Sequence, residues 1–191
     1  MYENLSLEEL LNHTHDHAAW YWIGMAYWER YDFSNAAVWL GKTMSDPSNE
    51  WAGKAKLNLG LAHAGGYLPN SSKDEALRLF EEILEKMPNA ISTKLHAGFL
   101  YCEGTETKRD TVKGGKLIKE AIQQFKDRDG GKDDYLSQIE CYKVGVMYEA
   151  EGIRDKSIEY YRKAIKRANE NYPSDRNLIE KAKEAIRELG G

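Results

Sequence analysis

The chain has 191 residues, of which 41% are hydrophobic and 30% are charged, and its formal net charge is −4 at pH 7. This length suits one compact domain or a short repeat array, and the net charge does not indicate nucleic acid as a partner. No stretch approaches the ~20 apolar residues of a membrane span, and the start, MYENLSLEEL, lacks the basic and apolar regions of a signal peptide. We therefore expect a cytoplasmic protein with no membrane partner. The two cysteines, Cys102 and Cys141, fit a reducing compartment.

Helical periodicity runs through nearly the whole sequence, with apolar residues three and four apart and little strand-like alternation. A leading helix within 5–13 begins at Ser6, where Ser6-Leu7-Glu8-Glu9 has the hydroxyl and the carboxylate of a capping box. Helix pairs then follow over 16–31 with 34–44, 49–65 with 72–87, 90–103 with 109–126, and 133–151 with 154–170. A last helix over 175–189 has the polar outer face that an end cap of a repeat array requires.

The helix pairs are related to one another in sequence. Each first helix has a glycine in its middle and a Tyr or His three residues later; the glycines are Gly24, Gly60, Gly98 and Gly145. A mid-helix glycine costs about 1 kcal/mol relative to alanine, so four at matching places predict close approach of a partner helix. Each second helix has a small residue near its start, followed three residues on by a bulky pair; the small residues are Ala36, Ala76, Gly114 and Ser157.

This pattern resembles the tetratricopeptide-repeat family and its Sel1-like relatives. Trp20-x-x-Ile23-Gly24-x-x-Tyr27 matches the family signature W-x-x-L-G-x-x-Y. From the glycine to the small residue the spacing is 12 in repeats one and four and 16 in repeats two and three, which resembles the longer internal loop of Sel1-like repeats. Lys56, Lys94 and Cys141 depart from the pattern by replacing the opening aromatic residue.

The resemblance covers roughly residues 16–170 and implies a fold. We expect an all-α right-handed superhelix of four hairpins in a single domain over 1–191. The repeats would span about 16–46, 49–87, 90–128 and 133–171, between the leading helix and the capping helix.

The run WYWIGMAYWERY, residues 20–31, divides into two faces when each residue is turned by about 100° from the last. One face should pack on the partner helix, and it holds Trp20, Ile23, Gly24, Tyr27 and Tyr31. The opposite face holds Tyr21, Trp22, Met25 and Trp28. In tetratricopeptide proteins this opposite face of the first helix lines a concave groove.

The resemblance therefore implies a peptide-binding groove along the first helices. Its residues would be Tyr21, Trp22, Met25, Trp28, Leu57, Asn58, Leu61, Leu95, His96, Phe99, Tyr142, Lys143 and Val146, with Glu149 at one end. Such a surface is mostly apolar, with a few polar groups to fix the register of a bound amphipathic helix or extended peptide. We thus expect a protein-interaction module, an adaptor or chaperone-like protein, whose partner the sequence does not identify.

Two other functions remain open for these residues. The leading helix, with Leu5, Leu7, Leu10 and Leu11, could cover the aromatic face, or a second copy of the chain could hide it in a dimer. An RNA-binding module is a further alternative, because aromatic and basic residues interleave in Tyr160-Tyr161-Arg162-Lys163-Ala164-Ile165-Lys166-Arg167.

The sequence gives little support for catalysis, a cofactor or a metal. His13 and His17 would share one face of a helix, but a tight metal site needs three or four converging ligands. The stretch 127–134 is rich in Asp and Gly, yet Gln138 stands where a calcium loop needs its closing Glu. Since no nucleophile–base pair has a recognisable spacing either, we expect a non-enzymatic protein without a cofactor or metal.

Overall fold

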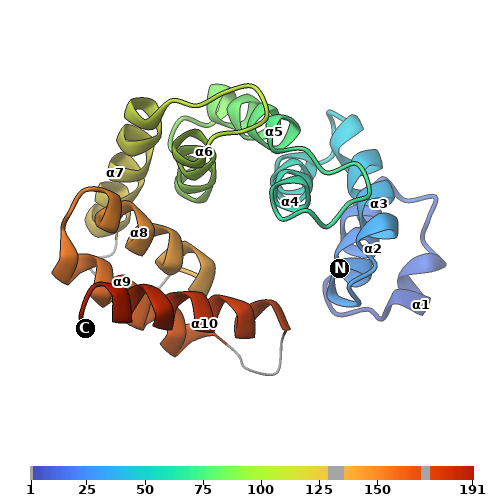
Figure 1. The fold of residues 1–191 in the computed structure, drawn as a ribbon. Helices are drawn as coiled ribbons and strands as arrows, with labels where there is room; N and C mark the ends of the chain where they lie inside the picture. The colour runs from blue at the N-terminus through green and yellow to red at the C-terminus, as the bar shows by residue number, and fades with distance from the viewer. Residues whose placement is uncertain (1, 129–135, 169–172) are drawn as a thin grey trace. The chain divides into compact units, whose positions relative to one another are not determined.

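The computed structural model describes residues 2–128, 136–168 and 173–191, and its helices are labelled in Figure 1. The chain forms two compact units, Met1–Thr111 and Val112–Gly191. Unit 1 contains α1 (Leu7–Leu11), α2 (His17–Glu29), α3 (Phe33–Ser45), α4 (Ala52–Ala64), α5 (Lys73–Lys86) and α6 (Ile91–Glu103). Unit 2 contains α7 (Thr111–Arg128, which begins at the boundary), α8 (Gln138–Ala150), α9 (Arg154–Arg167) and α10 (Pro173–Glu188). The described ranges hold no β-strand, which confirms the all-α prediction.

The helix starts follow the sequence signals. Ser6 and Glu9 form the expected capping box, in which Ser6 Oγ accepts the Glu9 N–H and the Glu9 carboxylate accepts the Ser6 N–H. Asp16 caps α2 by accepting the Ala18 N–H at 2.9 Å. A second capping box, which was not predicted from the sequence, starts α8 at Ser137 with Glu140.

Three of the four mid-helix glycines lie where two helices approach closely, as predicted. A Cβ placed on Gly60 would lie 2.4 Å from Cε1 of Phe80, and one on Gly145 would lie 2.7 Å from the ring of Tyr161. In the first hairpin the corresponding distance is 2.9 Å, to Cγ of Leu40. Real Cβ contacts are never this short, so these helices pack with the bulky residue of the second helix directly on the glycine of the first.

The turns inside three hairpins share one geometry. The residue two positions after each first helix has a positive φ, and it is Tyr31 (61°), Gly66 (72°) or Gly152 (71°). The next N–H bonds back to a carbonyl five residues earlier, for example from Asp32 to Tyr27 O at 3.1 Å. This closure usually uses glycine, because a side chain is strained at positive φ.

Tyr31 corrects the helical face assignment. It was predicted to lie in the core with Ile23 and Tyr27, but it is 53% exposed. The reason is that α2 ends at Glu29, so the left-handed turn directs Tyr31 away from the helical periodicity. Trp20 is also only half-buried, with its indole N–H donating to the carbonyl of Thr14 at 2.9 Å.

We expect Tyr31→Gly to stabilise unit 1 by up to about 1 kcal/mol, because glycine adopts a positive φ without steric strain. The urea midpoint followed by tryptophan fluorescence would measure the change. Gly66→Tyr, the opposite exchange in the next hairpin, should lower that midpoint, and a lowered midpoint for Tyr31→Gly would contradict the strain argument.

Within unit 1, successive helices pack in chain order, α2 on α3, α3 on α4, α4 on α5 and α5 on α6. In unit 2, α8 packs on α9, and α10 packs on both. The predicted third hairpin pairs α6 with α7, and these two helices fall in different units. The single domain over 1–191 therefore stays a prediction.

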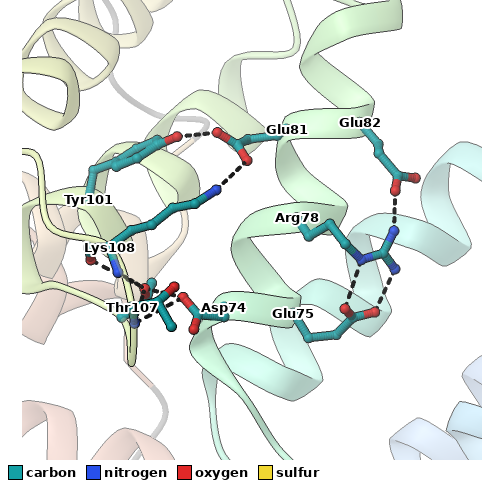
Figure 2. Close-up of polar contacts among 9 residues, drawn as sticks. Asp74, Glu75, Arg78, Glu81, Glu82, Tyr101, Thr107 and Lys108 are labelled. Carbon is teal, nitrogen blue, oxygen red and sulfur yellow. Dashed lines mark hydrogen bonds and ion pairs between the residues drawn. The ribbon is translucent and has the colours of Figure 1, made fainter.

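The longer loop of repeat three is held on the N-terminus of α5. The Glu106 carboxylate accepts the backbone N–H groups of Lys73 at 3.0 Å and Asp74 at 2.8 Å. Asp74 in turn accepts the Thr105 hydroxyl. Figure 2 shows the neighbouring contacts on α5, where Glu81 meets Lys108 and the Tyr101 hydroxyl. The extra residues of this loop thus supply acceptors to a helix end that has unpaired N–H groups.

We expect Glu106→Gln to lower the urea midpoint of unit 1, because a neutral amide is a weaker acceptor for these N–H groups. Backbone N–H groups, its own first and then those of Lys73 and Asp74, lower the pKa of Glu106 below its usual 4.5. Its stabilising effect is therefore present above pH 4.5 and lost as the pH falls further. The midpoint difference between wild type and Glu106→Gln should shrink below pH 4.5, and a pH-independent difference would contradict this role.

Candidate functional site

The N-terminal part of the predicted groove is an aromatic cluster where α2 meets α4. The ring of Tyr21 stacks on Trp51 with 5.1 Å between centroids, and Trp22 meets both rings edge-on at 5.2 and 5.0 Å. Tyr21 is only 8% exposed and belongs to the core with Leu40 and Leu59. It was predicted to line the groove, but the structure places it beneath Trp22 and Trp51 in the packing between neighbouring hairpins.

The leading helix covers part of the aromatic face of α2. Leu10 packs on Ala19 and Ile23 of α2, and Trp22 contacts this cluster as well. The Tyr2 hydroxyl, just before α1, donates to Asp16 at 2.5 Å. The leading segment therefore covers the Ala19–Ile23 side of α2 and touches one flank of Trp22.

Met25 and Trp28 follow Trp22 along the same face of α2. The Asn58 side-chain amide of α4 donates to Met25 Sδ at 3.0 Å, so the two helices are bonded in the middle of this face. Trp28 meets Phe33 edge-on at 5.1 Å, and Phe33 stacks on Tyr67 at 4.6 Å. Leu57 and Leu61 of α4 are partly buried and are not part of the buried cluster.

We call the partly buried residues along these two helices the α2–α4 face; they are Trp22, Met25, Trp28, Leu57, Asn58 and Leu61. The face combines stiff aromatic rings with one amide. Trp51, which completes the aromatic cluster, was not among the predicted site residues although it lies within the predicted helix over 49–65; in the structure it is the cap residue before α4.

The first helix of the third predicted hairpin, α6, offers no comparable surface. Leu95, His96 and Phe99 were predicted to line the groove, but they are 1%, 4% and 7% exposed. The His96 ring lies 5.8 Å from the ring of Phe80 on α5. In this structure these three side chains are not open to a ligand.

Unit 2 contains a groove of about 710 Å³ between α8 and α10, with α9 at its base. Tyr142 and Val146, both predicted groove residues, line it together with Glu149 and Ala150 of α8. Lys143, the third predicted residue of this repeat, does not line it. The other lining residues are Tyr161 of α9 and Lys181, Glu184, Ala185 and Glu188 of α10. We call this space the α8–α10 groove.

The α10 residues of this groove were not among the predicted site residues. Their numbers, 181, 184, 185 and 188, follow the three- and four-residue spacing of one helical face. That spacing was visible in the sequence, but these residues were assigned to the polar outer face of an end cap.

Burial and a charged neighbour perturb Tyr161 at the base of the groove. Its hydroxyl donates to Glu149 Oε2, and its ring lies 5.4 Å from that of Tyr142. Burial first, and then the hydrogen bond to the Glu149 carboxylate, raise the pKa of Tyr161 above its ordinary 10.0. Tyr161 therefore stays neutral in the folded protein at pH values where an unfolded tyrosine ionises.

This raised pKa predicts alkaline sensitivity. Stability from Tyr161 is fully present below pH 10 and is lost as the pH rises above 10, because only the unfolded chain then ionises this tyrosine. Tyr161→Phe should cost about 1 kcal/mol at pH 7 through the lost hydrogen bond. The difference should shrink above pH 10 when urea unfolding is followed by far-UV circular dichroism, and a constant difference would contradict the assignment.

The two histidines considered as metal ligands, His13 and His17, have different neighbours. His17 Nδ1 lies 2.6 Å from Asp46 Oδ2, whereas the His13 ring lies 5.2 Å from that of Tyr2. Among the described residues no three His, Cys, Asp or Glu side chains form a group that could hold a metal ion. Most of the stretch 127–134, considered as a calcium loop, lies outside the described ranges.

Two basic side chains of the α9 segment considered for RNA binding already have partners within the protein. Lys163 pairs with Glu159 at 2.6 Å, and Arg167 donates to the carbonyl of Leu136 at 2.6 Å. Tyr160 and Tyr161 are buried, so they do not present rings on which bases could stack. Arg162 and Lys166 are exposed.

Three hairpins thus repeat one packing unit, a glycine under a bulky residue of the next helix. The chain is similar to Sel1-like and tetratricopeptide-like repeat proteins. In this chain the small and bulky residues that form the packing unit lie at the repeat spacings found in the sequence.

Comparison with solved structures returned helical-repeat proteins. A Sel1 repeat protein from Oxalobacter formigenes superposes with a TM-score of 0.48 and 18% identity, over 81% of this chain and 60% of that one. MamA gives 0.47 and 16% over 84% of each chain. A protective antigen of uropathogenic Escherichia coli with an SLR fold gives 0.45 and 19%, over 84% of this chain and 41% of that one. No family model and no curated protein matches the sequence.

In the described parts of this repeat fold, no helix has the length and apolar character needed to cross a membrane.

Proposed function

We propose that the chain is a non-enzymatic protein-interaction module that binds a segment of another protein through its first helices. The observation that carries this proposal is the α2–α4 face, where Trp22, Met25 and Trp28 are only partly buried beside Leu57 and Leu61. Tryptophan and other large, stiff side chains contribute most to binding energy at protein interfaces.

The chemistry of the face fits an amphipathic helix or an extended peptide with apolar side chains. The rings around Tyr21 are held by mutual stacking, so they lose little conformational entropy on binding. Asn58 lies in the middle of the face and could form a hydrogen bond with a ligand backbone. An interior dominated by packing between helices also gives a rigid support for such a surface.

The test is a selection of randomised 12-residue peptides on the immobilised full chain. The key variant, Leu57→Gln/Leu61→Gln, keeps the side-chain size but removes apolar surface from the face. Val38→Gln is the control, because Val38 is 55% exposed on α3 and lies outside the face. Circular dichroism would first show that both variants remain folded.

We expect wild type and Val38→Gln to retain the same apolar peptides. The double variant should bind them about tenfold more weakly, because each lost leucine contact removes about half of a tenfold step. Equal binding by all three proteins would overturn the assignment of the face. If the purified chain instead doubles in mass with concentration, and Leu57→Gln/Leu61→Gln abolishes the doubling, the face is a dimer interface.

A further inference from the structure

The α8–α10 groove has a different chemistry from the α2–α4 face, and it carries a separate inference, which rests on the proposed function as a protein-binding module. We propose that this groove binds a protein segment that presents a basic side chain, Lys or Arg, beside an apolar one. The lining residues, their charges and the aromatic base of the groove support this partner chemistry.

The groove is built by two facing helical stripes. On α8 the lining residues are spaced by four, three and one, at 142, 146, 149 and 150. On α10 they are spaced by three, one and three, at 181, 184, 185 and 188. Each stripe is one face of its helix, and the groove lies between α8 and the C-terminal half of α10, which contacts both α8 and α9.

The charge of the lining is negative. Glu149, Glu184 and Glu188 line the groove, and Lys181 is the basic residue among the lining side chains. Within the described part of the chain, Glu184 and Glu188 have no ion-pair partner. The Tyr161 hydroxyl uses Oε2 of Glu149, which leaves Oε1 able to accept from a ligand. These carboxylates favour a cationic group and disfavour an acidic segment.

The base of the groove adds a second preference for cations. Tyr142 is only partly buried and lines the groove, whereas the ring of Tyr161, 5.4 Å away, is buried, so Tyr142 is the ring that a ligand cation can reach. A cation over an aromatic face is attracted by the ring quadrupole. Val146, Ala150 and Ala185 supply apolar surface next to these rings, so the alkyl part of a Lys or Arg, or a neighbouring apolar residue, has somewhere to pack.

The experiment uses the same randomised peptide library on the full chain at low salt. Glu184→Gln/Glu188→Gln removes two carboxylates from the groove without changing side-chain size. Glu159→Gln/Glu180→Gln is the matched control. Both residues are exposed and lie outside this groove, and the two substitutions remove the same charge. The peptides that wild type enriches would be synthesised, and their affinities measured by fluorescence anisotropy.

We expect wild type and the control to enrich peptides with Lys or Arg next to apolar residues. These peptides should bind Glu184→Gln/Glu188→Gln about tenfold more weakly, and their affinity for wild type should fall with added salt. The affinity of these peptides should be unchanged by Leu57→Gln/Leu61→Gln.

Two results would overturn the inference and are distinguishable from failure of the proposed function. If apolar peptides bind through the α2–α4 face but no cationic peptide is enriched, the module binds protein and the groove assignment is wrong. The same holds if enriched cationic peptides bind both charge variants equally. If no peptide of any kind is enriched, the proposed function and this inference both fail.

Discussion

Replacing Gly60 by alanine is expected to destabilise unit 1 by about 2 kcal/mol. The added Cβ would lie 2.4 Å from the Phe80 ring, which is fully buried and cannot turn aside without displacing its neighbours. Overpacking of this kind typically costs about 1–3 kcal/mol, which outweighs the gain of up to about 1 kcal/mol that alanine brings to a helix. The urea midpoint of tryptophan fluorescence would report the loss.

Gly41→Ala is the matched control for this prediction. Gly41 lies in α3, and a Cβ there meets nothing within 4 Å, so alanine should raise the midpoint through helix propensity alone. Phe80→Leu should make room for the new methyl group, so that Gly60→Ala costs less in its presence. If Gly60→Ala and Gly41→Ala change stability equally, close helix approach is not the reason for the mid-helix glycine.

The second large effect concerns Trp22, and here the structure changes the expectation. On helical periodicity Trp22 faces away from the partner helix and could be truncated safely. It instead contacts Tyr21 and Trp51 and also packs on the cluster around Leu10. We therefore expect Trp22→Ala to destabilise unit 1 by about 3 kcal/mol, at the lower end of the range for buried tryptophan because the ring is only half-buried.

The urea midpoint would measure the loss of stability. Near-UV circular dichroism would show whether the Tyr21–Trp51 stack loses its order at the same time. Trp22→Phe is the control, since a phenyl ring keeps part of the edge contact and should recover most of the stability. A Trp22→Ala variant as stable as wild type would mean that the ring is a free surface group. Leu57 and Leu61 are accordingly better positions for testing binding.

Much of the fold could be predicted because the strongest signals were local. The mid-helix glycines and the bulky residues of the second helices, such as Gly145 and Tyr161, indicate the same contact from both sides of a hairpin. The capping box at Ser6 likewise depends only on residues three apart. Such signals do not require knowledge of how one hairpin is rotated against the next.

The candidate site was harder to predict for that reason. Periodicity places Tyr21 away from its own partner helix, yet it is buried in a cluster with Leu40 of α3 and Leu59 of α4, and the periodicity of one helix contains no information on the neighbouring hairpin. Tyr31 was misplaced because helical periodicity was continued through a left-handed turn. The contribution of Glu184 and Glu188 depends on how α10 returns along α8, which the spacing within α10 does not specify.

The order in which the helices pack also has a consequence for kinetics. In both units helices pack chiefly on neighbours in the sequence, such as α2 on α3, α4 on α5 and α8 on α9. Short loops close at low entropic cost, so hairpins of this kind form rapidly and need not form at the same moment. All five tryptophans, at 20, 22, 28, 39 and 51, lie in unit 1, so fluorescence follows that unit alone. Stopped-flow refolding monitored by fluorescence and by far-UV circular dichroism should therefore give two different time courses.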